Sequence, residues 1–116
     1  PMPRLKITVL RTSVHHELAA AHLATQPEKC PDFTEGQEFV LDNFRMPAGF
    51  CTWAWQDMFY AAHTLWNGGS FQPWYRENGV VVVSCTDGLR PVLFRIERLD
   101  NPAGPDTREE SCESKN

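Results

Sequence analysis

Residues 79–99 read Gly79-Val-Val-Val-Val-Ser-Cys85, then Thr86-Asp-Gly-Leu-Arg90, then Pro91-Val-Leu-Phe-Arg-Ile-Glu-Arg-Leu99. The first segment is a short run built on four consecutive valines, which predicts a strand in the centre of a sheet. The third segment alternates apolar and polar residues, as a strand with one buried face does. The Asp-Gly pair between them is preferred hairpin chemistry, so the whole stretch predicts two antiparallel strands joined by a turn.

The chain before this hairpin predicts two further strands and two helices, at Leu5–Thr12 and Gln37–Leu41 and at about Val14–Ala24 and Trp53–Trp66. Alternation indicates the strands, and apolar residues at helical spacing behind the capping residues Ser13 and Thr52 indicate the helices. The order of elements is therefore βαβαββ. It predicts one α+β domain at residues 1–99, in which two helices pack on one face of a four-stranded, mainly antiparallel sheet.

Residues 100–116 are rich in Pro, Gly, Ser and Glu and have no periodicity, so they predict a disordered acidic tail. The 116-residue chain has a formal net charge of −4, of which this tail, with five acids and two bases, supplies −3. The remaining residues are then close to neutral, which argues against a nucleic-acid partner.

The sequence also argues against other classes of protein. No apolar run approaches the ~20 residues that span a bilayer, and the first residues lack the apolar core of a secretion signal. A cytoplasmic location without membrane attachment is therefore expected. There is no Gly-rich phosphate loop, so no nucleotide cofactor is expected. The expected partner is a small-molecule substrate or ligand, and a homo-oligomer is left open.

The segment Met46-Pro-Ala-Gly-Phe-Cys-Thr-Trp-Ala-Trp55 places a cysteine at the start of the main helix, with two tryptophans just inside it. The thiol of Cys51 lies at the positive end of the helix macrodipole, which suggests a reactive group. Cys30 and Cys85 also lie at the ends of elements, without the short spacing of a zinc knuckle or a redox dithiol. Such cysteines are catalytic groups, metal ligands or small buried hydrophobes, and the sequence leaves these alternatives open.

Two further residues are candidates for acid–base chemistry. Asp87 follows Cys85 by two positions, so both side chains point the same way at a strand end and could share a proton. The alternative is that Asp87 only builds the hairpin turn, and the two roles are compatible. His63, between the apolar and polar faces of the main helix, is a candidate general base or a boundary residue without a chemical role.

Aromatic residues are concentrated between residues 53 and 75. One face of the main helix carries the predicted buried stripe, which consists of Cys51, Trp55, Met58, Phe59, Ala62 and Trp66. On a second face, Asp57 and Tyr60 lie beside Trp53, an arrangement that can orient a small polar ligand. With Trp55 and Trp74 these residues predict a tryptophan-lined pocket, unless this face is only packed under the loop at 70–78.

Several motifs occur together within Leu5–Leu99: Cys30-Pro31, Gly36-x-x-Phe39, Pro47-x-Gly49-x-Cys51-x-Trp53-Ala54-Trp55, Cys85-x-Asp87 and Pro91-Val92-x-Phe94. By these motifs the chain resembles a widespread family of small three-cysteine proteins, about one hundred residues long, to which no activity is assigned. The resemblance implies that the three cysteines belong to one constellation. It implies no mechanism.

Three functions are compatible with these residues. The first is a small enzyme of lyase or isomerase type, without an organic cofactor, that acts on an apolar or aromatic molecule in the tryptophan-lined pocket. Its catalytic candidates are Cys51, Cys85, Asp87 and His63. The second is a metal-binding module in which Cys30, Cys51 and Cys85 hold zinc or copper. The third is a binding domain for a small molecule or a protein, with its cysteines in the core.

Overall fold

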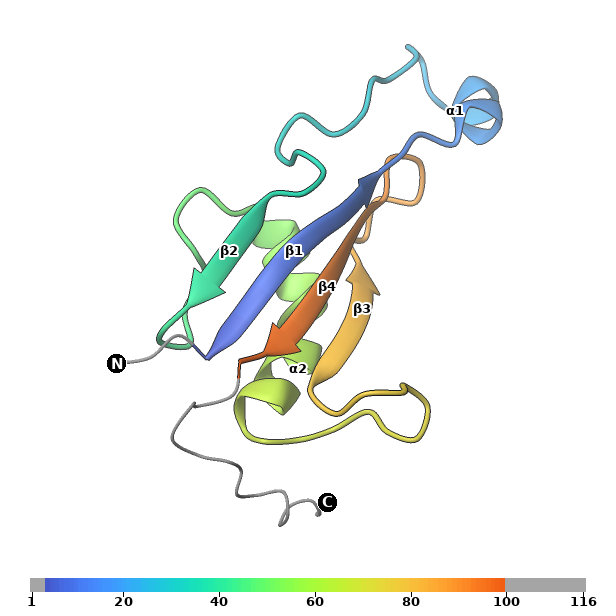
Figure 1. Cartoon of the computed structure of the whole chain (residues 1–116). Coiled ribbons are helices and arrows are strands. Elements are labelled where there is room, and N and C mark those ends of the chain that lie inside the picture. Colours follow the sequence, from blue (N-terminus) through green and yellow to red (C-terminus); the bar gives the residue numbers. More distant parts are fainter. Residues whose placement is uncertain (1–3, 100–116) are drawn as a thin grey trace.

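The computed structural model describes residues 4–99, which form one sheet, one long helix and one short helix (Figure 1). The elements are β1 (Leu5–Thr12), α1 (His16–His22), β2 (Glu38–Leu41), α2 (Thr52–Trp66), β3 (Val80–Ser84) and β4 (Val92–Arg98). The predicted α+β class and the order βαβαββ are confirmed. The acidic tail predicted at 100–116 lies outside the described residues. Within residues 4–99, no helix has the length and apolar character needed to cross a membrane.

All strand pairs are antiparallel, and the strand order is β2-β1-β4-β3 (Figure 1). β1 and β4 form the centre, with Ile7 directly opposite Ile96. Their ladder shifts register between Val9 and Arg11, which marks a bulge near the end of β1. The two strands of the predicted hairpin, β3 and β4, are neighbours as expected, with Val83 opposite Phe94.

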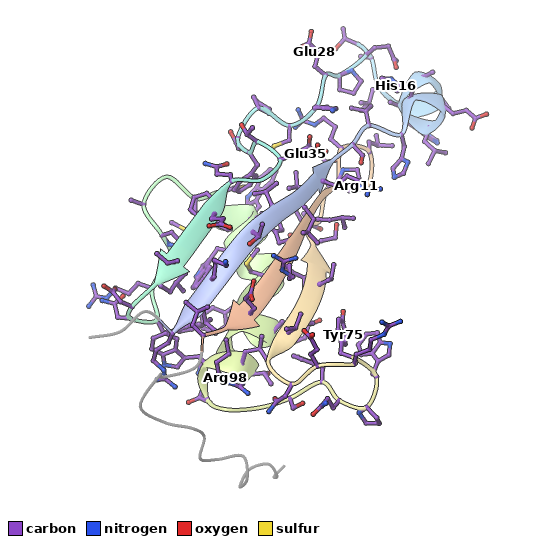
Figure 2. The ribbon with its side chains drawn as sticks, viewed as in Figure 1. Arg11, His16, Glu28, Glu35, Tyr75 and Arg98 are labelled. Atoms are coloured by element: carbon purple, nitrogen blue, oxygen red, sulfur yellow. The ribbon has the colours of Figure 1, made fainter. Side chains whose placement is uncertain are left out.

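The valine run that was expected in the centre of the sheet is instead the edge strand β3. Only alternate valines face the core, since Val81 is 3% exposed and Val82 is 40% exposed. The Tyr75 hydroxyl donates to the Val82 carbonyl and accepts from the Val82 amide, both at 3.1 Å (Figure 2). A side chain thus covers backbone groups that a further strand would pair in the centre of a sheet. Valine content alone does not show whether the outer backbone groups of a strand bond to another strand or to a side chain.

α2 lies across one face of the sheet and closes the hydrophobic core (Figure 1). Its core residues are each at most 1% exposed: Ala54, Met58, Ala61, Ala62 and Leu65. The strand residues that form the core from the sheet are equally buried: Leu5, Ile7, Val9, Val92, Phe94 and Ile96. At the end where α2 begins, the ring of Phe33 contacts those of Phe50 and Phe94, with centroids 5.1 and 5.0 Å away. This aromatic cluster ties the start of α2 to the centre of the sheet.

The buried stripe of α2 is rotated from the predicted one. Met58 and Ala62 are buried as expected, but Phe59 is 44% exposed and Trp55 and Trp66 are only half-buried. The alanines of the neighbouring face let α2 approach the sheet closely, whereas the large rings fit at its flank. There Phe44 contacts all three rings, at centroid distances between 5.2 and 5.6 Å.

The start of α2 also differs from the prediction. Thr52 is the first residue of the helix, and Cys51 occupies the N-cap position without a side-chain capping hydrogen bond. The predicted cap at Thr52 is therefore wrong by one residue, because the chain is still extended at Cys51 and turns helical immediately after it. The predicted glycine stop is confirmed, since Gly68 has a φ of +88°, the left-handed conformation that favours glycine after a helix.

Two arginines bind the carbonyl groups at the C-terminal end of α2. Arg98 lies at the end of β4 and donates to the carbonyls of Leu65 and Gly69 at 3.0 and 2.7 Å (Figure 2). Arg4 donates to the Trp66 carbonyl at 2.7 Å, and its guanidinium lies 4.3 Å from the centroid of the Trp66 ring. Positive charge at this end of a helix complements the macrodipole, so these arginines hold α2 in place from the sheet.

α1 does not pack on the sheet, which corrects the expectation that both helices cover one face. It is shorter than the predicted helix at 14–24 and projects, with the loop after it, beyond the end of β1 (Figure 1). Ala19 is buried, but Leu18 is 51% exposed, so the short helix offers too little apolar surface to cover a sheet. It is tied to the β3–β4 connection instead, where the His15 amide donates to the Leu89 carbonyl at 2.9 Å.

Candidate functional site

A cleft of about 320 Å³ lies between segment 23–27, which follows α1, and segment 87–90, which joins β3 to β4. Apolar side chains, one threonine and one charged pair line it: Leu23, Ala24, Pro27, Leu89, Thr25, Asp87 and Arg90. Small-molecule sites are concave, mainly apolar and typically ~300–1,000 Å³ in volume, with a few placed polar groups. The cleft has this composition, and we take it as the candidate functional site.

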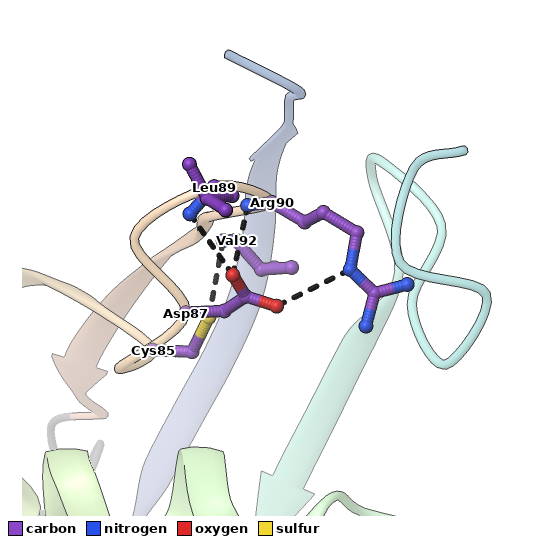
Figure 3. A network of polar contacts seen from close by, with 5 residues as sticks. All are labelled: Cys85, Asp87, Leu89, Arg90 and Val92. Carbon is purple, nitrogen blue, oxygen red and sulfur yellow. Dashed lines mark hydrogen bonds and ion pairs between the residues drawn. The ribbon is translucent and has the colours of Figure 1, made fainter. Parts of the chain in front are cut away.

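Asp87 organises one wall of the cleft. Its Oδ1 accepts from the amides of Leu89 and Arg90 at 2.9 and 3.0 Å, and its Oδ2 accepts from Arg90 Nε at 3.2 Å (Figure 3). Burial alone would raise the pKa of Asp87, but these hydrogen bonds and the charge of Arg90 outweigh it and lower the pKa from its ordinary 3.8. Asp87 orders the β3–β4 connection, but the predicted two-residue Asp-Gly turn is not formed: the connection runs from residue 85 to residue 91, and Gly88 does not have the positive φ of such a turn. With both oxygens occupied, Asp87 is a weak base.

Replacing Asp87 with asparagine tests this role, because asparagine retains one acceptor and loses the charge. We expect Asp87→Asn to lower the free energy of unfolding at pH 7 by about 1 kcal/mol, a modest value because the Asp87 side chain is 36% exposed. The folded-state pKa is depressed, so the carboxylate stabilises the fold above its unfolded pKa of about 4. That stabilisation is lost as the pH falls through the lower, folded-state pKa.

The measurement is urea unfolding of both proteins at pH 7, 5 and 3. The difference in the free energy of unfolding between wild type and Asp87→Asn should be the same at pH 7 and pH 5 and smaller at pH 3. The exposed Asp42 provides the control, and Asp42→Asn should change little at any pH. A difference that grows on acidification would contradict the assigned role of Asp87.

The three cysteines found within residues 4–99 lie at the same end of the domain. Cys51 precedes α2, and its neighbour Phe50 contacts Phe33, three residues after Cys30. Cys85 follows β3, and its sulfur accepts the Val92 amide at 3.3 Å (Figure 3). All three are free, half-buried and packed against the core.

A metal site is not assembled from the described residues. Between residues 4 and 99, no group of three or more His, Cys, Asp or Glu side chains is arranged to hold a metal ion. The zinc or copper site proposed for Cys30, Cys51 and Cys85 therefore gains no support from the geometry and stays a prediction. The packing of each cysteine against the core agrees with the alternative of small buried hydrophobes.

The predicted aromatic pocket residues do not line the cleft, and they point in several directions. Trp53, Tyr60 and Trp74 are surface residues, 70%, 66% and 80% exposed. Trp53 lies in the first turn of α2, whereas Trp74 lies beyond the last turn, so they belong to opposite ends of that helix. Trp55 packs against Phe44, as described above. The structure therefore does not bring the tryptophans together around one cavity.

His63 and Asp57 are also separate from the cleft. His63 is exposed in the last turns of α2 and stacks on Phe59, with ring centroids 5.6 Å apart and planes 11° apart. It lies twelve positions after Cys51, which corresponds to about 18 Å along the helix axis, so one small molecule cannot contact both of these predicted catalytic residues. Asp57 is half-buried, and its Oδ2 has no hydrogen-bond partner among residues 4–99.

Sequence reasoning missed most of the cleft. It singled out Asp87, but not Arg90 or the residues of segment 23–27. Arg90 was foreseeable in part, because an Asp at a turn commonly engages the groups two and three residues later. Segment 23–27 was assigned in part to a helix, and its position opposite the β3–β4 connection depends on how the short α1 is held.

Fold and site together define a small α+β domain with a sheet covered by one long helix and a ligand-sized cleft at one end. No protein-family model matches the chain, and no curated protein or solved structure is significantly similar to it. The resemblance to small three-cysteine proteins accordingly stays a prediction from the motifs.

Proposed function

We propose that this protein binds a small, mainly apolar molecule in the cleft between segments 23–27 and 87–90. The single observation that carries the proposal is the cleft itself, about 320 Å³ with apolar walls around the Asp87–Arg90 pair. Both walls are loops held by the domain, which is where binding residues usually lie. Gln26 supports the first wall by donating to the Ala19 carbonyl at 3.3 Å, and Asp87 supports the second.

A second proposal adds lyase- or isomerase-type catalysis on the bound molecule. It is favoured by one observation, which is that Cys85 and Asp87 both belong to the β3–β4 connection that forms a wall of the cleft. Of the predicted catalytic residues, Asp87 lines the cleft, whereas Cys51, Cys85 and His63 do not. Binding is therefore the main proposal, and chemistry at Cys85 depends on it.

Binding can be tested by adding a library of small acids, amides, alcohols and amines to ¹⁵N-labelled protein and recording amide spectra. We expect some members to shift the amides of residues 23–27 and 87–90 selectively. Ala24→Trp should abolish these shifts, because Ala24 lines the cleft and the indole would fill it. The matched control is Ala20→Trp, at an exposed position of α1 that does not line the cleft, and it should retain the shifts.

The absence of selective shifts, or their persistence in Ala24→Trp, would contradict the binding proposal. Recovery of the bound compounds from the same samples tests the catalytic proposal. Conversion that disappears in Cys85→Ser would support it, whereas unchanged compounds would count against it.

A further inference from the structure

Arg90 has a fixed orientation and an unused hydrogen-bonding edge. Its Nε donates to Asp87 Oδ2 at 3.2 Å, and the side chain extends from the hairpin toward the chain that leads into β2 (Figure 3). Among residues 4–99, neither of its two terminal amino groups has a hydrogen-bond partner, although Arg90 lines the cleft. These amino groups form a planar donor edge, which is the geometry that binds two oxygens of one carboxylate.

The charge of Asp87 does not occupy that edge. Its Oδ1 accepts from the amides of Leu89 and Arg90, and within the described part of the chain its Oδ2 accepts from Arg90 Nε alone. Because the pKa of Asp87 is lowered, the carboxylate is ionised at neutral pH and keeps the guanidinium oriented. Asp87 therefore positions Arg90, and the outer donors stay available to a ligand.

The rest of the lining determines what such a ligand must look like. Leu23, Ala24, Pro27 and Leu89 provide apolar walls, and within the cleft lining the charged groups are Asp87 and Arg90. A molecule with several charges would leave most of them without partners against these walls. One anionic head with an apolar body satisfies both parts of the cleft.

Building on the proposed function, we infer that the ligand is a small aliphatic or aromatic monocarboxylate, recognised by the terminal amino groups of Arg90. The apolar tail lies against Leu23 and Leu89, and the carboxylate meets the edge formed by the two terminal amino groups, away from the Nε that Asp87 Oδ2 occupies. Arg90 thereby selects acids over neutral molecules of the same shape.

The test compares hexanoate with hexanamide, which have nearly the same shape and differ in the charge of the head. Affinities are measured by amide-shift titration at residues 23–27 and 87–90 of the full chain. We expect hexanoate to bind at least about 10-fold more tightly than hexanamide. In Arg90→Gln this ratio should fall to about one.

Arg95 provides a matched control, because its Nε also donates to an acidic side chain, that of Glu97 at 3.3 Å, but it does not line the cleft. Arg95→Gln should keep the wild-type ratio.

Equal binding of both compounds to the wild type would overturn the role of Arg90 and leave the binding function standing. A ratio that persists in Arg90→Gln would also overturn it. If neither these compounds nor any library member binds, the proposed function itself fails. The wild-type comparison needs no variant, so it decides the question even if Arg90→Gln does not fold.

Discussion

Phe94→Ala is expected to lower the free energy of unfolding by about 3–5 kcal/mol, the largest effect of any single change considered. Phe94 is fully buried in the central strand β4. Its ring contacts Phe33 and Phe50 at centroid distances of 5.0 and 5.7 Å, so it joins the sheet to the loop before β2 and to the start of α2. Removing it leaves a cavity among three elements that cannot collapse independently. A domain of this size has a total stability of roughly 5–15 kcal/mol, so much of it would be lost.

The measurement is urea unfolding followed by tryptophan fluorescence and circular dichroism. Phe94→Leu should lower the free energy of unfolding by a smaller amount, so it still allows a measurement if the alanine variant does not fold. Phe59→Ala provides the control, because Phe59 is 44% exposed at the flank of α2 and should cost about 1 kcal/mol or less. Equal losses at the two positions would show that the core is not centred on Phe94.

Arg98→Ala is expected to lower the free energy of unfolding by about 2–3 kcal/mol. The side chain donates to the carbonyls of Leu65 and Gly69, and its Nη2 donates to Asn78 Oδ1 at 2.9 Å. It therefore joins the end of β4 to the end of α2 and to the loop before β3. Alanine would leave partly buried carbonyls without donors and remove the positive charge from the negative end of the helix.

Hydrogen exchange gives the specific readout for Arg98. The amides of the last turn of α2 should exchange faster in Arg98→Ala by a larger factor than those of its first turn, because the loosening starts at the unsupported end. Arg98→Lys should recover part of the stability through its charge but not the forked geometry. Arg76→Ala, at an exposed arginine of the neighbouring loop, should have little effect. Uniform acceleration along α2 would contradict a local capping role.

The candidate site was only partly predictable. The sequence predicts Asp87 either as an acid–base group or as a turn residue, and its three hydrogen bonds support a role in ordering the β3–β4 connection. The aromatic pocket was inferred from helical spacing, which shows which residues share a face but not which face meets the sheet. The alanines of α2 pack closest to the strands, so its large aromatic rings lie at the flank of the helix or on the surface. Trp53 is one of the rings on the surface.

The types and order of the elements can be predicted from the sequence, because they depend on local properties: alternation in β1 and β4, helical spacing in α2 and glycine after the helix. The strand order, the edge position of β3, the buried face of α2, the form of the β3–β4 connection and its contact with α1 emerge only in the folded domain. These depend on side-chain volumes and hydrogen bonds between residues far apart in the chain. The cleft belongs to this second group, because its two walls lie about sixty positions apart and meet only when α1 is tied to Leu89.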